Sequence, residues 1–290
     1  METKVSTPTR EVIISYDRPT VIIGERINPT GKKKLQEALK TGDLSIVKKE
    51  ALEQVAAGAT ILDCNVNAPG VDDVKLLPEA IKVIQDAVDV PICIDSPNAA
   101  ALAAGLKVYK GKPLVNSISG EKARLERVLP LIKEYGAAVI GLAQDDEGIP
   151  KTTARRVAIT YKIVEACEKM GVPREDIVID VMTYAIGAEP KAAIDVLNAL
   201  RQIRTELGLN MTMGASNISF GMPDRLILNN AWMAMVIEAG GTALIADAAK
   251  VLPAVLSADL VLGRDRFARR YLADHRKRAE LAAQAAQQAK

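Results

Sequence analysis

The chain has 290 residues, of which 49% are hydrophobic, 26% are charged and only 3% are aromatic. This length suits one large domain whose core is built from Ala, Val, Ile and Leu. The formal net charge of +2 gives no electrostatic case for a nucleic-acid partner. No apolar run approaches the ~20 residues of a membrane span and the start lacks the apolar core of a signal peptide, so we expect a cytoplasmic protein without a membrane partner.

Residues 1–19 are polar and contain proline, which predicts a lead-in segment. After it, eight short β-rich apolar runs follow one another along the chain, and polar residues gather where the runs end. The runs are Val21–Arg26, Ala59–Asn65, Pro91–Ser96, Pro113–Ser117, Ala137–Leu142, Ile177–Asp180, Met211–Asn217 and Ala243–Asp247. Continuous apolar runs of this kind, separated by helical stretches, are typical of buried parallel strands.

Stretches with apolar residues at close to helical spacing separate these runs. They cover Lys33–Ala57, Glu79–Val88, Ala99–Val108, Lys122–Tyr135, Thr152–Met170, Pro190–Leu207, Arg225–Ala239 and about Leu252–Val261. Gly136, Gly171 and Gly240 follow three of them, where a left-handed residue commonly ends a helix. The alternation predicts an α/β fold, a single-domain (β/α)8 TIM barrel over residues 1–263, with its chemistry at the carboxyl ends of the strands.

Residues 264–290 form a basic, Ala-rich extension with eight Lys or Arg and three Asp or Glu. Its helix propensity is high throughout, which predicts a helix. Two interpretations stay open: a solvated terminal extension, or a basic surface that contacts an acidic partner or another subunit.

The cysteines and the single histidine do not form a metal-binding pattern. Cys64, Cys93 and Cys167 are far apart in sequence, so we expect them to be reduced and buried. His275 lies in the charged tail, which argues against a zinc site. The strand-end aspartates offer oxygen ligands for Mg²⁺, but the Asn and Ser beside them are poorer ligands, so no protein metal site is expected. Lys and glycine are also scarce where a barrel normally binds phosphate.

Three strand-end residues predict the ligand. Asp95, Asn116 and Asp180 end the third, fourth and sixth runs, so their side chains should project into one pocket. Two carboxylates beside an amide can accept hydrogen bonds from an amino group and a ring N–H, as the 2-amino-4-oxo edge of a pterin or guanine requires. The alternative is that these residues cap the helices that follow.

The segment Gly214-Ala215-Ser216-Asn217 follows the seventh run. A glycine near a strand end allows close approach to the backbone, and Asn217 offers both a donor and an acceptor. The alternative is again a helix N-cap.

Six motifs in order resemble one known family. They are Val21-Ile22-Ile23-Gly24-Glu25-Arg26-Ile27-Asn28-Pro29-Thr30-Gly31, Leu62-Asp63-Cys64-Asn65-Val66, Ile94-Asp95-Ser96, Val115-Asn116-Ser117, Ile179-Asp180 and Gly214-Ala215-Ser216-Asn217-Ile218-Ser219. They resemble the pterin-binding methyltetrahydrofolate:corrinoid protein methyltransferases and the folate domain of cobalamin-dependent methionine synthase. The likeness runs from Val21 to about Lys250.

This resemblance implies a homodimeric TIM barrel that holds the pterin of tetrahydrofolate in the barrel mouth. It places Asp95, Asn116 and Asp180 on the pterin ring, and Asn217 on N5, the nitrogen that carries the methyl group. It makes Arg225 a neighbour of the benzoyl-glutamate portion. Glu25, Asn65, Gly214 and Ser216 complete the expected substrate contacts. Where such enzymes carry a glutamine after the asparagine, this chain has Phe220.

The activity that the resemblance implies is methyl transfer between N5 of tetrahydrofolate and the cobalt of a corrinoid, such as cobalamin, carried by a separate protein. The direction stays open: from 5-methyltetrahydrofolate to Co(I), or from methyl-cobalt to tetrahydrofolate in a demethylase system. The protein would hold the pterin, favour charge at N5 and leave one face open. The alternatives are a dihydropteroate synthase-like pterin enzyme and a non-catalytic folate-binding protein.

Overall fold

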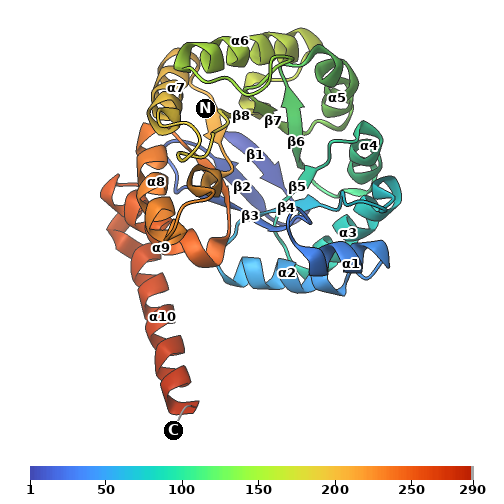
Figure 1. Cartoon of the computed structure of the whole chain (residues 1–290). Coiled ribbons are helices and arrows are strands. Elements are labelled where there is room, and N and C mark those ends of the chain that lie inside the picture. Colours follow the sequence, from blue (N-terminus) through green and yellow to red (C-terminus); the bar gives the residue numbers. More distant parts are fainter. Residues whose placement is uncertain (289–290) are drawn as a thin grey trace.

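The computed structural model describes residues 1–288, and its centre is an eight-stranded parallel sheet curved into a barrel (Figure 1). The strands are β3 (Val21–Ile27), β4 (Ile61–Asn65), β5 (Ile92–Asp95), β6 (Leu114–Ser119), β7 (Ala138–Leu142), β8 (Ile177–Asp180), β9 (Asn210–Thr212) and β10 (Ala243–Ala246). They pair in the order β10-β3-β4-β5-β6-β7-β8-β9. The predicted TIM barrel is therefore confirmed, and each strand lies inside or overlaps its predicted run.

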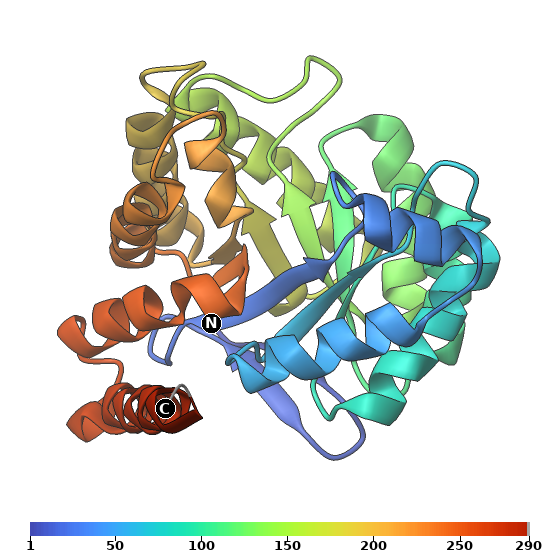
Figure 2. The same cartoon turned by 60° about the horizontal axis from the view of Figure 1, so that its bottom comes forward.

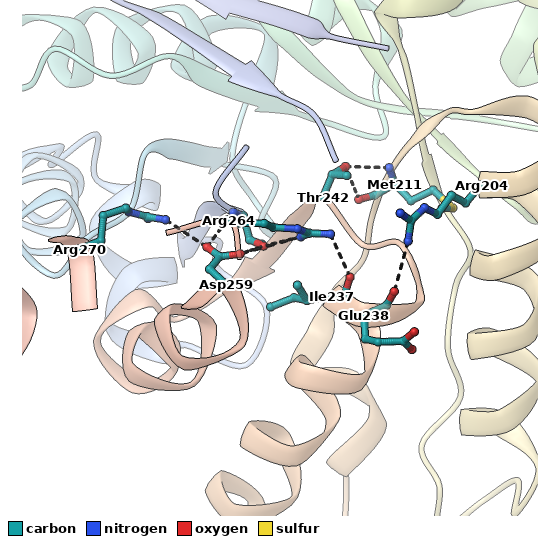
Figure 3. Close-up of polar contacts among 9 residues, drawn as sticks. Arg204, Met211, Ile237, Glu238, Thr242, Asp259, Arg264 and Arg270 are labelled. Carbon is teal, nitrogen blue, oxygen red and sulfur yellow. Dashed lines mark hydrogen bonds and ion pairs between the residues drawn. The ribbon is translucent and has the colours of Figure 1, made fainter. Parts of the chain in front are cut away.

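Hydrogen bonds between the last two strands close the barrel. The Thr242 N–H and the Ile245 N–H each donate at 2.9 Å, to the carbonyls of Met211 and Met213. A parallel bridge between Gly214 and Ile245 extends this contact toward the carboxyl end. Figure 3 shows Thr242 beside Met211 at the start of the seam. These contacts bring the two edge strands of the sheet together, and they fix where the strand ends lie relative to one another.

Helices surround the barrel on its outside, as Figure 1 shows. They are α1 (Lys33–Lys40), α2 (Ser45–Ala56), α3 (Asp73–Ala87), α4 (Ala99–Val108), α5 (Lys122–Tyr135), α6 (Thr153–Met170), α7 (Ala192–Leu207), α8 (Arg225–Ala239) and α9 (Ala248–Val261), with short 3₁₀ turns η1 (Arg174–Asp176) and η2 (Ala215–Ser219). The helices α4, α5 and α8 have the predicted bounds.

Three helical predictions need correction. The last barrel helix, α9, begins at Ala248 rather than at about Leu252. The single helix expected over Lys33–Ala57 is two helices, because Gly42 adopts φ +73° and ends the first one. The third helix begins at Asp73, six residues before its predicted start, because the Asp72 side chain caps it and the helix tolerates Pro78. Of the three glycines expected to end helices, Gly136 and Gly171 are left-handed, whereas Gly240 has φ +129°.

The predicted lead-in is a β-hairpin, formed by β1 (Thr3–Ser6) and β2 (Glu11–Ile14). Its Val5, Val12 and Ile14 are buried against the lower interior of the barrel. The Asn210 amide, at the start of β9, donates to the Ile14 carbonyl at 2.8 Å. The hairpin therefore closes the amino-terminal end of the barrel, and Figure 1 shows it across the centre of the ring.

The chain ends in η3 (Arg266–Ala268) and α10 (Arg269–Gln288), and Figures 1 and 2 show α10 extending away from the barrel. One buried carboxylate anchors this tail, because Asp259 accepts a bond from the Thr20 N–H at 2.9 Å and another from Arg270 at 3.0 Å. Figure 3 shows the contact between Asp259 and Arg270. Thr20 precedes β3, so the anchor lies at the amino-terminal end. The helical extension is confirmed, and its last two residues, 289–290, lie outside the described residues. No helix in residues 1–288 is long and apolar enough to span a membrane.

Candidate functional site

A cavity of about 730 Å³ opens at the carboxyl ends of the strands. It is lined by Glu25, Asn28, Thr30, Lys32, Asp63, Asp95, Asn116, Gly214, Ser216, Asn217, Phe220, Arg225, Leu226, Asn229, Ile245, Asp247, Lys250 and Val251. Its volume is in the range of small-molecule and cofactor sites. The cavity therefore lies where barrel enzymes carry out their chemistry.

The two-residue period of a strand explains this acidic lining. Residues that face the barrel interior alternate with residues that face the helices. The interior residues are apolar in the lower part of the barrel, for example Ile61, Cys93 and Leu114. Two residues later, the same inward positions carry Asp63, Asp95 and Asn116 on adjacent strands. Each strand thus changes from core residues to polar residues within one repeat.

Asp63, Asp95 and Asn116 form one end of the cavity, and the Asn65 amide adjoins it. The Asn116 amide donates to Asp63 at 3.3 Å, and the Asn65 amide donates to Asp95 at 2.9 Å. Burial raises the pKa of Asp95 to about 6, although the Asn65 bond and Arg124 act against the shift. Burial, reinforced by the nearby Asp95 charge, raises the pKa of Asp63 well above its usual value. This end can therefore present a carboxylate and a protonated carboxyl side by side.

Asp180 lies at the end of β8 but does not line the cavity. Its carboxylate accepts a hydrogen bond from the Met182 N–H at 2.8 Å, and it is almost fully buried. Burial raises its pKa to about 6, while the backbone N–H groups of Met182 and Gly214 lower it. The fully buried Arg156 donates to the Val181 and Met182 carbonyls, at 2.9 and 3.2 Å, and so fixes the turn that Asp180 contacts.

The η2 turn presents Asn217 at the opposite wall. The Asn217 side chain is exposed to the cavity, and the part of the chain that the structure describes gives its amide no hydrogen-bond partner. A Cβ on Gly214 would lie 2.7 Å from Asn217 Nδ2. The space that this glycine leaves is therefore occupied by the Asn217 side chain. The Asn217 side chain does not cap η2 or α8, so the alternative of a helix N-cap does not apply to it.

Arg225 holds the η2 turn in shape. Its Nε donates to Ser219 Oγ and its Nη2 donates to the Ser216 carbonyl, both at 2.9 Å. Its guanidinium lies 4.8 Å from the centroid of the Phe220 ring. The predicted ligand contact is thus also a structural clamp, since it joins the start of α8 to the turn that carries Asn217.

Glu25 occupies the third side of the cavity, at the end of β3. The Ser216 hydroxyl donates to Glu25 Oε2 at 3.4 Å, which joins β3 to the η2 turn across the closing seam. Burial raises the pKa of Glu25, and the positive charge of Lys32 opposes the shift. Lys32 donates to the Arg26 carbonyl at 2.9 Å and so folds the following loop over the strand end.

The structure therefore brings together seven of the nine predicted site residues: Glu25, Asp95, Asn116, Gly214, Ser216, Asn217 and Arg225. Asn65 and Asp180 are not among the lining residues, and Asn65 reaches the site only through its bond to Asp95. Sequence reasoning considered Asp63 as a possible Mg²⁺ ligand and as part of a family motif but gave it no contact with the substrate, although it lines the cavity. In the sheet register Asp63 lies beside Cys93, and Asn65 lies beside Asp95. Within the described residues, no group of three or more His, Cys, Asp or Glu is arranged to hold a metal ion.

Comparisons with known proteins match this chain to one family and to several enzymes. The model of the family "Pterin binding enzyme" matches residues 24–247. Methylcorrinoid:tetrahydrofolate methyltransferase of Eubacterium limosum is 31% identical over 262 residues, which cover 87% of this chain and 94% of that protein. Methionine synthase of Mycobacterium tuberculosis is 30% identical over 87% of this chain, but the match spans only 22% of that much longer protein.

Solved structures show the same fold. The dihydropteroate synthase of Vibrio fischeri ES114 has a TM-score of 0.66 at 17% identity, and the match covers 90% of this chain and 99% of that one. The Yersinia pestis enzyme with a pterine-sulfa conjugate has a TM-score of 0.67 at 16% identity, over 91% of this chain and all of that one. At such low identity, these structures support the barrel and no particular reaction.

Proposed function

The chain belongs to the pterin-binding enzyme family, and from that premise we propose that it transfers a methyl group between N5 of tetrahydrofolate and the cobalt of a corrinoid. It is an enzyme, since the E. limosum relative that it matches over almost its whole length is a methyltransferase of this kind. We further propose that the corrinoid arrives on a partner protein.

The acidic end of the cavity carries this proposal. Asp63, Asp95 and Asn116 lie on three adjacent strands and present carboxyl and amide groups to one ligand edge. A pterin presents an amino group, a ring N–H and a carbonyl along one edge, so acceptors and a donor are both required there. Charge-assisted bonds to the carboxylate would hold the ring in a fixed orientation. Asp180 would support this edge from behind, through the turn at Met182.

Asn217 would act at the other end of the ring. Its amide can accept a hydrogen bond from protonated N5 or donate one to neutral N5, because it carries both groups. A hydrogen bond that strengthens as charge develops at N5 lowers the barrier, and one such contact is typically worth about 3 kcal/mol. The corrinoid supplies the reactive cobalt, and the barrel supplies binding and orientation.

The test is methyl transfer from 5-methyltetrahydrofolate to free Co(I) cobalamin, and in reverse from methylcobalamin, followed by the cobalamin absorbance. Asn217→Ala should lower kcat by about 100-fold while folate still binds. Asn198→Ala removes an exposed amide on α7, far from the cavity, and should leave the rate unchanged.

Other outcomes separate the alternatives. Folate binding without turnover, even with corrinoid proteins added, would favour a folate-binding protein. Condensation of a pterin pyrophosphate with p-aminobenzoate would favour a dihydropteroate synthase. No folate binding at all would contradict the pterin assignment. The homodimer and the cytoplasmic location stay predictions, which sedimentation and cell fractionation can test.

A further inference from the structure

The proposed reaction requires a proton at N5, and this inference rests on that proposed function. When the methyl group leaves, N5 of the folate must end with a hydrogen in its place, and in the reverse direction that hydrogen must be removed. Four carboxyl groups line the cavity and could exchange this proton with N5. They are Asp63, Asp95, Asp247 and Glu25.

Three of the four are committed elsewhere. Asp63 and Asp95 lie at the acidic end and are bound by the Asn116 and Asn65 amides. Asp247, at the end of β10, forms an ion pair with Lys250 at 3.0 Å.

Glu25 is the remaining carboxyl. It has no ion pair within 4 Å among the described residues, since the neighbouring Lys32 ammonium donates to backbone carbonyls instead. Its hydrogen-bond partner is the Ser216 hydroxyl at 3.4 Å, and Ser216 is the residue before Asn217. Glu25 and Ser216 both line the cavity.

We propose that Glu25 is the proton donor and acceptor for N5, and that it acts through the Ser216 hydroxyl beside Asn217. A hydroxyl donates one proton while it accepts another, and its hydrogen rotates freely, so it can relay a proton between a carboxyl group and a ring nitrogen. Catalysis by such a group requires a pKa near the operating pH, and the burial that raises the pKa of Glu25 moves it in that direction.

The charges around Glu25 come from four elements. Lys32, in the loop after β3, and Lys250, on α9, lower its pKa, whereas Asp247 at the end of β10 raises it. The charge of Glu25 in turn raises the pKa of Asp63 on β4. Arg26, the next residue on its own strand, is turned outward to Glu50 and Glu53 on α2.

The step balances in both directions. Glu25 gives its proton to Ser216 Oγ, the Ser216 hydroxyl proton passes to the N5 lone pair, and Glu25 becomes a carboxylate. The N5–CH₃ bond then breaks with its electron pair left on N5, while an electron pair from Co(I) forms the bond to the methyl carbon. In reverse, tetrahydrofolate attacks the cobalt-bound methyl group, and the N5 proton returns to Glu25 by the same route.

The test is the pH profile of methyl transfer from 5-methyltetrahydrofolate to Co(I) cobalamin. The wild-type rate should fall as pH rises through the pKa of Glu25, and the reverse reaction should fall as pH decreases. Glu25→Gln keeps the shape but has no acidic proton, so it should lower kcat by about 100-fold. It should also abolish that limb of the profile, while the Kd for folate stays within about 3-fold.

Further variants separate a relay from a structural role. Ser216→Ala should reproduce the loss, and the double variant should be no slower than the slower single variant, since both residues serve one path. Glu126→Gln removes an exposed carboxylate on α5 and should change nothing. Wild-type turnover together with an unchanged profile in Glu25→Gln would overturn this proposal alone. Folate binding by Glu25→Gln shows that it folds, and Glu25→Asp, which retains a carboxyl group, should recover part of the rate and the pH limb.

Discussion

At the scale of single residues, several carboxyl groups in the cavity or next to it are buried, and their burial lowers the stability of the folded protein. Asp180 is almost fully buried, and its bonds come from backbone N–H groups rather than from a cation. Asp63 and Asp95 share the acidic end, where burial again raises both pKa values. Such groups are retained at functional sites although apolar or neutral residues would stabilise the fold better.

Asp180→Asn should therefore stabilise the protein without ligand at neutral pH. The folded pKa of Asp180, about 6, lies above its ordinary value of 3.8. The stability that protonated Asp180 provides is therefore complete below pH ~4 and is lost as pH rises through about 6. At 1.36 kcal/mol per pKa unit, the loss is about 2 to 3 kcal/mol. The difference in Tm between Asp180→Asn and wild type should be positive at pH 7.5 and near zero at pH 4.

The control is Asp146→Asn, which changes an exposed aspartate. It should shift Tm equally at both pH values. The reasoning would be contradicted if wild type had the higher Tm and if its advantage over Asp180→Asn were larger at pH 7.5 than at pH 4.

Gly214→Ala should separate activity from stability. The added Cβ would lie 2.7 Å from Asn217 Nδ2, the end of a flexible, exposed side chain, so the chain can fold but Asn217 must move. We expect a change in unfolding free energy below about 1 kcal/mol and a fall in kcat of about 10-fold or more, because displacing a catalytic contact by 1 Å is costly. Urea unfolding and the cobalamin assay measure the two effects. Equal rates for both proteins would place Asn217 outside the reaction.

Most residues of the site could be predicted because they stand at the ends of predicted strands. Asp95 and Asn116 lie where a buried run turns polar, and a barrel brings such ends to one cavity. Asn65 and Asp180 also stand at strand ends, yet neither lines the cavity, because the Asn65 amide bonds Asp95 and the Asp180 carboxylate bonds the Met182 N–H. That choice depends on tertiary contacts, which a single run does not contain. Asp63 was missed as a ligand contact because it lies inside an apolar run rather than at the end of one.

At the scale of elements, the barrel helices were easier to predict than the segments between them. The helices α4, α5 and α8 end at features of their own sequence, so local patterns suffice. The hairpin of β1 and β2 is different. Its strands pair locally, but it is held to the barrel by residues such as Asn210, which lies 196 positions after Ile14 in the sequence. The break between α1 and α2 depends on the left-handed conformation of Gly42, in a stretch whose apolar spacing continues without interruption.

Gly111→Ala should loosen the hairpin. Gly111 has φ +116°, and a Cβ there would lie 2.1 Å from the Ser6 carbonyl oxygen. That carbonyl accepts the Lys112 N–H at 3.0 Å, which joins β1 to the residues before β6. We expect a loss of about 3 kcal/mol or more.

The matched control is Gly208→Ala. Gly208 also has a positive φ, +63°, but nothing lies within 4 Å of its added Cβ, so only the backbone cost of about 1 kcal/mol applies. Thermal unfolding should rank wild type, Gly208→Ala and Gly111→Ala in that order of decreasing Tm. The reverse order of the two variants would show that the Ser6 contact is unimportant.

At the scale of the whole molecule, the two ends of the barrel have separate roles. The carboxyl end carries the cavity, and the amino end carries the hairpin and the anchor of the C-terminal tail. Asp259, fully buried, bonds Thr20 and Arg270 and so attaches the tail before α10 extends outward. Lys277 adds a contact to the Ala56 carbonyl at 2.6 Å, at the same end.

Truncation after Arg270 should therefore leave the site intact. The Asp259 contacts remain, while most of α10, which extends from the amino end, is removed. We expect kcat and the folate Kd to stay within about 2-fold of wild type, and Tm to fall by only a few degrees. Asp259→Ala should instead destabilise the protein. It leaves Arg264 and Arg270 without their carboxylate, which should lower the free energy of unfolding by about 3 kcal/mol. Loss of turnover on truncation would instead assign the tail a role in catalysis.

The hairpin has a consequence for how the protein is made. Thr3 and Tyr16 leave the ribosome well before Glu175 and Leu209, whose carbonyls they bond. The hairpin thus has no barrel to close until most of the chain exists, and β3 must wait for β10 before the ring is complete. Until then, the apolar side chains of Val5, Val12 and Ile14 lack most of the barrel residues against which they pack. The hairpin is therefore exposed to chaperones and to misassembly until β9 and β10 have been synthesised.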